Sequence, residues 1–329
     1  MRLSLCSRAR SVRPFRWSPN APDHHRRRRL SLLVIMGATG TGKSRLSIDV
    51  ASRFPSEVIN ADKIQLYRGL DITTNKIPLR DRRSVPHHLL GDADPSAGEL
   101  SPISFRSLAA SAAASIASRS RLPVIAGGSN SLLHSLLSDR FDPLTPLGYD
   151  FRSPVRLRFN CCFLWVDVRE PVLSEQLDRR VDDMLGLGMF EELAGYIGTP
   201  EARAESGRNV GLNRAIGVPE FERYFRRFGS AVANPETDVA ARAGYEEAVR
   251  EIKENTRRLA EAQREKIVKL GSSGGWRLNR VDATEAVRAG LEGEPDRFRE
   301  AWDRDVLRPG LKVVKRFLDE SAFENNTFY

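Results

Sequence analysis

Near its start the chain carries the stretch Gly37-Ala38-Thr39-Gly40-Thr41-Gly42-Lys43-Ser44, directly after an apolar run at residues 31–36. The stretch has the pattern of a P-loop, in which one Gly is followed, after four residues, by Gly-Lys-Ser. In a P-loop, backbone N–H groups surround the phosphate oxygens. In that role Lys43 adds a positive charge, and the Ser44 hydroxyl can bind Mg²⁺. An apolar run of this length is typical of a buried parallel strand. The stretch therefore predicts a phosphate-binding loop at the end of a buried strand.

Strand and helix patterns alternate along the residues that follow the loop. Residues 43–54 predict a helix, residues 57–60 a short strand, and residues 102–119 another helix. Apolar runs at residues 122–126 and 162–166 predict two more buried strands. Such alternation indicates an α/β fold, a P-loop NTPase-like parallel sheet flanked by helices.

Beyond about residue 170 the segments become long, charged and amphipathic. The longest, residues 239–270, repeats apolar side chains every three or four positions, as a helix packed on one face does. We expect a leader at residues 1–30, a P-loop α/β core at 31–170, and a mainly helical region at 171–329 that packs on the core.

The positive charge of the chain is concentrated at its start. The whole chain has a formal charge of +9, but residues 1–30 hold nine Arg and one acidic residue, and the remainder holds 43 basic and 42 acidic residues. The leader is Arg-rich and acid-poor and lacks an apolar core, which favours an organellar transit peptide. We predict a plastid location, with a basic tail on a cytoplasmic protein as the alternative.

Composition argues against several other classes of protein. No apolar run approaches the 18 residues of a membrane span. Three cysteines, Cys6, Cys161 and Cys162, build neither a disulfide framework nor a Cys-x-x-Cys metal site, which indicates a reducing compartment. We expect a monomer.

Asp62 is the carboxylate expected to face the loop. It follows the predicted strand at residues 57–60, and in an open parallel sheet ligands bind beyond the carboxyl ends of the strands. A carboxylate there can accept a proton from an attacking nucleophile. A helix N-cap or an outer contact of Mg²⁺ are alternatives that the sequence leaves open. Asp167 is the nearest candidate for a Walker B carboxylate, and its weak match favours small-molecule kinases and phosphate-handling transferases over motor ATPases.

Several blocks in a fixed order resemble the isopentenyltransferases, and among them the plant adenylate isopentenyltransferases. One block reads Asn60-Ala61-Asp62-Lys63-Ile64-Gln65-Leu66-Tyr67-Arg68-Gly69-Leu70-Asp71-Ile72-Thr73-Thr74-Asn75-Lys76. The others are residues 37–44, 86–91, 125–131, 214–220 and 252–256. Together they span most of the chain after the leader.

The resemblance implies a prenyl transfer from dimethylallyl diphosphate to the N6 amine of AMP, ADP or ATP. The loop would then hold the diphosphate that leaves, with Mg²⁺ as cofactor. Asp62 matches the general base of the family, and Thr39 matches a threonine near the reacting end of the donor. Arg106 and Ser129 match positions near the donor or its diphosphate.

The acceptor is the point on which branches of the family differ. This chain has no Cys after Cys162 and no His after His134, so it lacks the Cys/His zinc finger common in eukaryotic tRNA-modifying members, which argues against tRNA. For the acceptor phosphates we predict Arg214, Lys253 and Arg257 in the helical region, with a solvated helix face as the alternative for each.

Two positions depart from the family pattern. Plant members usually have Arg where this chain has Asn213, and again where it has Ala262. Both departures remove a cation, and they keep open the hypothesis of a phosphate-binding protein that has lost catalysis. Prenyl transfer to tRNA and a P-loop small-molecule kinase are two further alternatives.

Overall fold

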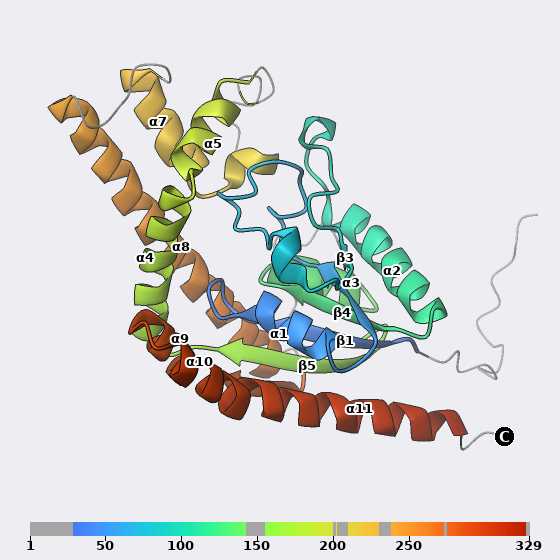
Figure 1. Cartoon of the computed structure of the whole chain (residues 1–329). Helices are drawn as coiled ribbons and strands as arrows, with labels where there is room; N and C mark the ends of the chain where they lie inside the picture. Colours follow the sequence, from blue (N-terminus) through green and yellow to red (C-terminus); the bar gives the residue numbers. More distant parts are fainter. Residues whose placement is uncertain are drawn as a thin grey trace, which may run out of the picture.

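A computed structural model of the chain describes residues 29–142, 155–199, 202, 210–229, 238–272 and 275–326. The leader predicted at residues 1–30 lies almost wholly outside the described residues. Figure 1 shows a central sheet with helices on both faces and a group of helices that extends to one side.

The sheet has six strands in the order β3-β2-β4-β1-β5-β6. Every neighbouring pair is parallel, which confirms the predicted fold class. The strands are β1 (Ser31–Met36), β2 (Ser56–Asn60), β3 (His87–His88), β4 (Leu122–Gly127), β5 (Asn160–Asp167) and β6 (Leu278–Asp282). Because these strands are parallel, the loop after β1 and the residues after β2 lie at the same edge of the sheet, on either side of the end of β4.

Strand β1 is apolar throughout because both of its faces are covered. Successive side chains of a strand point to opposite faces. Leu32, Val34 and Met36 enter one hydrophobic core, and Leu33 and Ile35 enter the other. The run that begins the P-loop motif is therefore the central, doubly buried strand of the sheet.

Helices from both halves of the chain cover the two faces. The first core includes residues of α2 (Pro102–Ser118), α3 (Asn130–Leu137) and the end of α8 (Val239–Ser272). The second includes residues of α1 (Lys43–Ala51), α9 (Thr284–Leu291), α10 (Pro295–Trp302) and α11 (Arg308–Asn326). In Figure 1, α11 runs along the sheet on the side of β5.

A helical group stands beside the sheet. It consists of α4 (Val172–Gly186), α5 (Met189–Ile197), α7 (Val218–Phe228) and the first part of α8 (Figure 1). Phe190 joins α5 to the rings of Phe221 on α7 and Tyr245 on α8, with centroids 5.3 and 5.4 Å away. Aromatic packing thus holds α5, α7 and α8 together, and α8 runs on from this group to the sheet.

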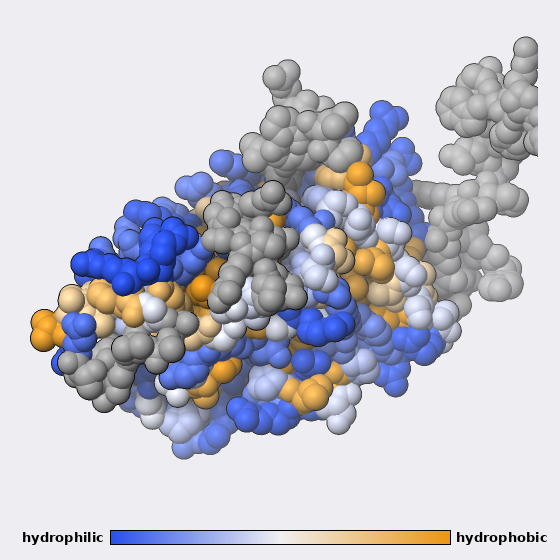
Figure 2. Space-filling view, turned by 90° about the horizontal axis from the view of Figure 1, so that it is seen from above, coloured by the Kyte–Doolittle hydropathy of each residue, from blue (hydrophilic) through white to orange (hydrophobic). Residues whose placement is uncertain are grey.

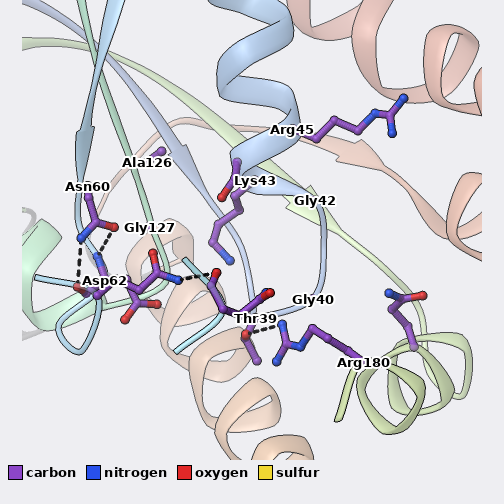
Figure 3. A pocket seen from close by; sticks show the side chains of 14 residues that line it. Thr39, Gly40, Gly42, Lys43, Arg45, Asn60, Asp62, Ala126, Gly127 and Arg180 are labelled. Carbon is purple, nitrogen blue, oxygen red and sulfur yellow. Dashed lines mark hydrogen bonds between the residues drawn. The ribbon is translucent and has the colours of Figure 1, made fainter. Parts of the chain in front are cut away.

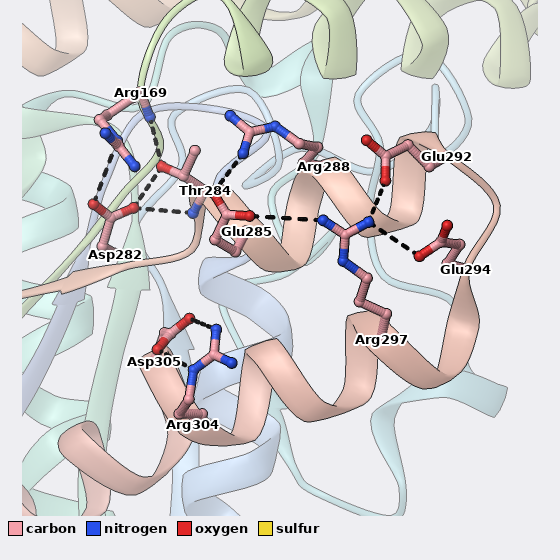
Figure 4. Close-up of polar contacts among 10 residues, drawn as sticks. All are labelled: Arg169, Asp282, Thr284, Glu285, Arg288, Glu292, Glu294, Arg297, Arg304 and Asp305. Atoms are coloured by element: carbon pink, nitrogen blue, oxygen red, sulfur yellow. Dashed lines mark hydrogen bonds and ion pairs between the residues drawn. The ribbon is translucent and has the colours of Figure 1, made fainter.

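Strand β6 was not predicted from the sequence. It pairs with β5 although it comes from the region expected to be mainly helical. Ion pairs on the adjoining surface link Arg169 to Asp282 and Arg297 to Glu285, Glu292 and Glu294 (Figure 4). Exposed pairs of this kind contribute little each, so the main attachment of β6 is its ladder with β5.

The surface shown in Figure 2 contains both hydrophilic and hydrophobic residues. On the face shown in Figure 2, hydrophilic residues surround small apolar patches. Among the described residues, no helix has both the length and the apolar character needed to cross a bilayer.

Candidate active site

The phosphate-binding loop links β1 to α1. Gly40 and Gly42 have φ angles of 83° and 94°, a region that favours glycine, and they give the loop its turn. The Ala38 carbonyl accepts hydrogen bonds from Thr41 Oγ1 at 2.9 Å and from Lys43 Nζ at 2.6 Å. Lys43 is therefore folded back over its own loop, at the start of α1.

Asp62 is positioned by the turn that follows β2. Its N–H donates to Asn60 Oδ1 at 3.1 Å, and Asn60 Nδ2 donates to the Leu89 carbonyl at 2.9 Å. One carboxylate oxygen, Oδ1, accepts the Ile64 N–H at 3.2 Å, a bond within a turn and not at a helix N-terminus. The Oδ2 oxygen has no hydrogen-bond partner among the described residues.

The loop and Asp62 share one cavity, of about 240 Å³. In Figure 3 the Lys43 ammonium points into the space between Asp62 and Thr39, and the Arg180 side chain enters from α4. The residues that line it are Thr39, Gly40, Gly42, Lys43, Ser44, Arg45, Asn60, Asp62, Gln65, Asn75, Ala126, Gly127, Gln176 and Arg180. The structure thus brings together the predicted catalytic residues Thr39, Lys43 and Asp62, and the predicted Mg²⁺ ligand Ser44.

The charges in the cavity influence one another. Burial lowers the pKa of Lys43 to about 8; the Asp62 carboxylate partly opposes this shift, and the Arg180 guanidinium adds to it. Burial also lowers the pKa of Arg180 to about 10, against the effect of Asp62. At neutral pH the site therefore presents two desolvated cations to an anionic ligand.

The pKa of Lys43 predicts a pH dependence. Above about pH 8 Lys43 loses its proton, so the cavity loses a positive charge and a phosphate ligand should bind more weakly. We expect kcat/KM for the phosphate-bearing substrate to fall towards tenfold per pH unit above about 8, because this ratio reports the free enzyme. The value of kcat should fall less, since a bound anion keeps Lys43 protonated. A profile that stays flat through about pH 9.5 would contradict this role.

Arg180 is a site residue that the sequence analysis missed. Its Nη1 donates to Thr39 Oγ1 at 3.0 Å, and its buried Nε has no partner among the described residues. The helix pattern contained a signal, because Arg180 lies three positions after buried Leu177 and four before buried Met184. A charged residue on the buried face of an amphipathic helix indicates a binding role.

Two predicted donor-site residues do not line the cavity. Arg106 donates to carbonyls at the end of α3, among them that of Ser138 at 2.7 Å. Ser129 Oγ accepts the Lys63 N–H at 2.8 Å, which ties the turn after Asp62 to the start of α3. Their contact with a diphosphate remains a prediction.

The predicted acceptor cations are engaged in ion pairs. Arg214 lies 3.0 Å from Glu99. On α8, Lys253 lies 2.6 Å from Asp182 on α4, and Arg257 pairs with Asp178 there. The two acidic partners, Asp178 and Asp182, flank Arg180 in the sequence of α4. None of the three cations lines the cavity, so their role towards acceptor phosphates stays a prediction.

Neither of the two departures from the family pattern lines the cavity. Asn213 accepts a hydrogen bond from the Tyr196 hydroxyl at 2.8 Å. Ala262 lies on α8 beside Gln263, whose Oε1 accepts the Thr39 N–H at 2.7 Å. Asp167, the candidate Walker B carboxylate, is buried and paired with Arg264 and Arg280 at 3.2 and 2.8 Å.

A P-loop at the edge of a parallel sheet, with a carboxylate in the same cavity as its lysine, indicates a protein that binds a phosphate-bearing ligand. The sequence model described as IPP transferase matches residues 65–156 and 143–267. The chain belongs to this family.

Among the similar proteins are plant enzymes that share about half of their residues with this chain. The chain is 53% identical to an adenylate isopentenyltransferase of Humulus lupulus, over 87% of this chain and 90% of the relative. It is 48% identical to adenylate isopentenyltransferase 1, chloroplastic, of Arabidopsis thaliana, over 89% and 82%. A solved structure of a eukaryotic dimethylallyltransferase acting on tRNA has the same fold, with a TM-score of 0.68 at 24% identity over 88% of this chain and 80% of that one.

Proposed function

We propose that this protein transfers a dimethylallyl group from dimethylallyl diphosphate to the N6 amine of AMP, ADP or ATP, the first step of cytokinin biosynthesis. The observation that carries the proposal is the shared cavity, in which Asp62 lies opposite Lys43 of the loop. The relatives named adenylate isopentenyltransferase support the choice of donor and acceptor.

In this proposal the loop binds the diphosphate that leaves. The backbone N–H groups of the loop, Lys43 and Arg180 surround the position where negative charge grows as the bond between C1 and oxygen breaks. Fixed donors aimed at growing charge are often the largest contribution to catalysis. Thr39 Oγ1 accepts a hydrogen bond from Arg180, which leaves the Thr39 hydroxyl proton free to point towards the bridging oxygen.

Asp62 would act on the acceptor. As the N6 nitrogen bonds to C1, pyrophosphate leaves with the electron pair of the broken bond, and one N6 proton passes to Asp62 Oδ2. The oxygen is available because only Oδ1 is used by the turn. An exocyclic amine is a weak nucleophile, so a positioned base contributes substantially to the rate.

Mg²⁺ fits the residues beside the loop. The Ser44 hydroxyl lines the cavity next to Lys43, and Mg²⁺ is commonly held by few protein oxygens together with substrate phosphates. Ser44 would hold it, and its charge would help to neutralise the diphosphate. Because Ser44 would hold the metal ion, Asp62 would remain available to accept the N6 proton.

Prenyl transfer to tRNA is the second candidate, and it is supported by the fold shared with a tRNA-modifying enzyme. We favour free nucleotides because the chain outside its leader is nearly neutral. The test offers the protein dimethylallyl diphosphate, Mg²⁺, and AMP, ADP or ATP in competition with unmodified tRNA. Prenylated free nucleotide is expected, and product on tRNA alone would replace our proposal by the second candidate.

We also infer that the leader directs the protein to plastids. The Arabidopsis relatives include several named chloroplastic and one named mitochondrial. Fusing residues 1–40 to a fluorescent protein tests the inference. Plastid fluorescence is expected, whereas mitochondrial or diffuse cytosolic fluorescence would contradict it.

A further inference from the structure

Thr39 accepts one hydrogen bond and donates another to side chains on two helices, α4 and α8, that are far from it in the sequence. Its hydroxyl accepts a hydrogen bond from Arg180 on α4, and its backbone N–H donates to Gln263 Oε1 on α8 at 2.7 Å. Thr39 also lines the cavity next to Lys43. Its side-chain direction is therefore determined by contacts outside the loop to which it belongs.

Gln263 is held rigidly. The residue is buried, with 9% of its surface exposed. Its backbone carbonyl accepts from Asn130 Nδ2 at 3.1 Å, at the start of α3. Behind the amide, Gly128 comes so close that a Cβ there would lie 2.7 Å from Gln263 Nε2. The amide therefore has little freedom to turn away from the loop.

These contacts connect α8 to the donor side of the cavity. Six residues earlier on the same helix, Arg257 pairs with Asp178 on α4, two residues before Arg180 in the sequence. Both groups that hold Thr39 thus come from the packed pair α4 and α8. The sequence analysis predicted acceptor contacts for Lys253 and Arg257 of α8, whereas Gln263 of the same helix contacts the loop.

We propose that Gln263 is a positioning residue, which fixes the backbone of Thr39 so that its hydroxyl points at the bridging oxygen of the donor. The proposal rests on the proposed function. Losing the Gln263 acceptor would leave the part-buried Thr39 N–H without this partner and would let the loop turn. A misplacement of about 1 Å can cost about a hundredfold in rate.

The contrasting explanation is that Gln263 only fills space between the loop and α3. The two explanations differ in how Gln263 and Thr39 depend on each other. If Gln263 acts through Thr39, its loss should have little effect once the Thr39 hydroxyl is gone, because effects of residues that act together are not additive. A packing role gives the same loss whichever residue stands at position 39.

The experiment uses Gln263→Met, which removes the acceptor at similar size, together with Gln263→Asn, whose amide is one methylene shorter. Each is made alone and with Thr39→Ala, and Glu265→Gln on the exposed face of α8 is the matched control. The rate of formation of prenylated nucleotide is measured at saturating and at limiting concentrations of dimethylallyl diphosphate. Thermal melting, followed by circular dichroism, checks that each variant is folded.

We expect Gln263→Met to lower kcat by about 10- to 100-fold, with the control close to the unchanged protein. In the Thr39→Ala background, Gln263→Met should cost less than about threefold. Should the Met variant not fold, Gln263→Asn, whose shorter amide does not reach the Thr39 N–H, takes its place with the same expectation. Multiplicative losses of the two substitutions would overturn the positioning role. Failure of the unchanged protein to form any product would count against the proposed function instead.

Discussion

Asp62→Asn should lower kcat by about 10²- to 10⁴-fold, the usual contribution of a positioned general base. The amide keeps an oxygen for the Ile64 N–H, so the turn after β2 should stay intact. It does not accept the N6 proton, however. Donor binding should survive, because the loop that holds the diphosphate is unchanged. Steady-state kinetics of prenylated nucleotide formation, with KM measured separately for donor and acceptor, checks the expectation.

Asp62→Asn should also shift the pH dependence of kcat/KM for the donor. The Asp62 carboxylate raises the pKa of Lys43 against the effect of burial, so its removal lowers that pKa below about 8. The fall of kcat/KM for the donor should then begin at a lower pH. Asp81→Asn, in the exposed turn Leu79–Arg82, is the matched control and should alter neither quantity. A loss of less than about threefold in kcat for Asp62→Asn would remove Asp62 from the role of base.

Lys43→Met should lower kcat/KM for the donor by about 10²- to 10³-fold, since it removes a cation placed where the leaving diphosphate gains charge. Both kcat and KM should change, because in the proposed reaction the ammonium contacts the diphosphate before and during bond breaking. Lys43 itself is desolvated, which makes its charge unfavourable to folding. Replacement by an apolar side chain should therefore leave the melting temperature unchanged or raise it.

Activity and stability together make the test of Lys43 specific. Lys266→Met, on the exposed face of α8, removes a charge of the same kind outside the cavity and should leave activity unchanged. If Lys43→Met retained donor kcat/KM within about fivefold, the loop would not hold the diphosphate in the way proposed. A large fall in melting temperature would point instead to a structural role for Lys43.

The parts of the site that the sequence predicted are local in the chain. Strand β1, the loop and Lys43 form one continuous motif, and Asp62 follows the next strand directly, so pattern and strand order together placed them at one edge. Arg180 and Gln263 reach Thr39 from 141 and 224 residues away, and only the packing of α4 and α8 reveals them.

The remaining differences also have physical causes. In β6 only Val281 is buried, which is too weak an alternation to predict a strand; its position is determined by pairing with β5. Lys253 and Arg257 were predicted from their charge and their matching block. Their partners Asp182 and Asp178 lie on another helix, which no local pattern indicates.

The central claim is that the loop cradles the diphosphate of a prenyl donor, and that ATP, when present, is the acceptor. The most direct measurement incubates the protein with Mg²⁺, dimethylallyl diphosphate and ATP, and analyses the nucleotide by mass spectrometry while pyrophosphate release is followed. The account predicts ATP that has gained one dimethylallyl group on N6 and kept all three phosphates, with one pyrophosphate released for each nucleotide modified. Conversion of ATP to ADP without a prenylated product would contradict it and indicate a kinase or ATPase.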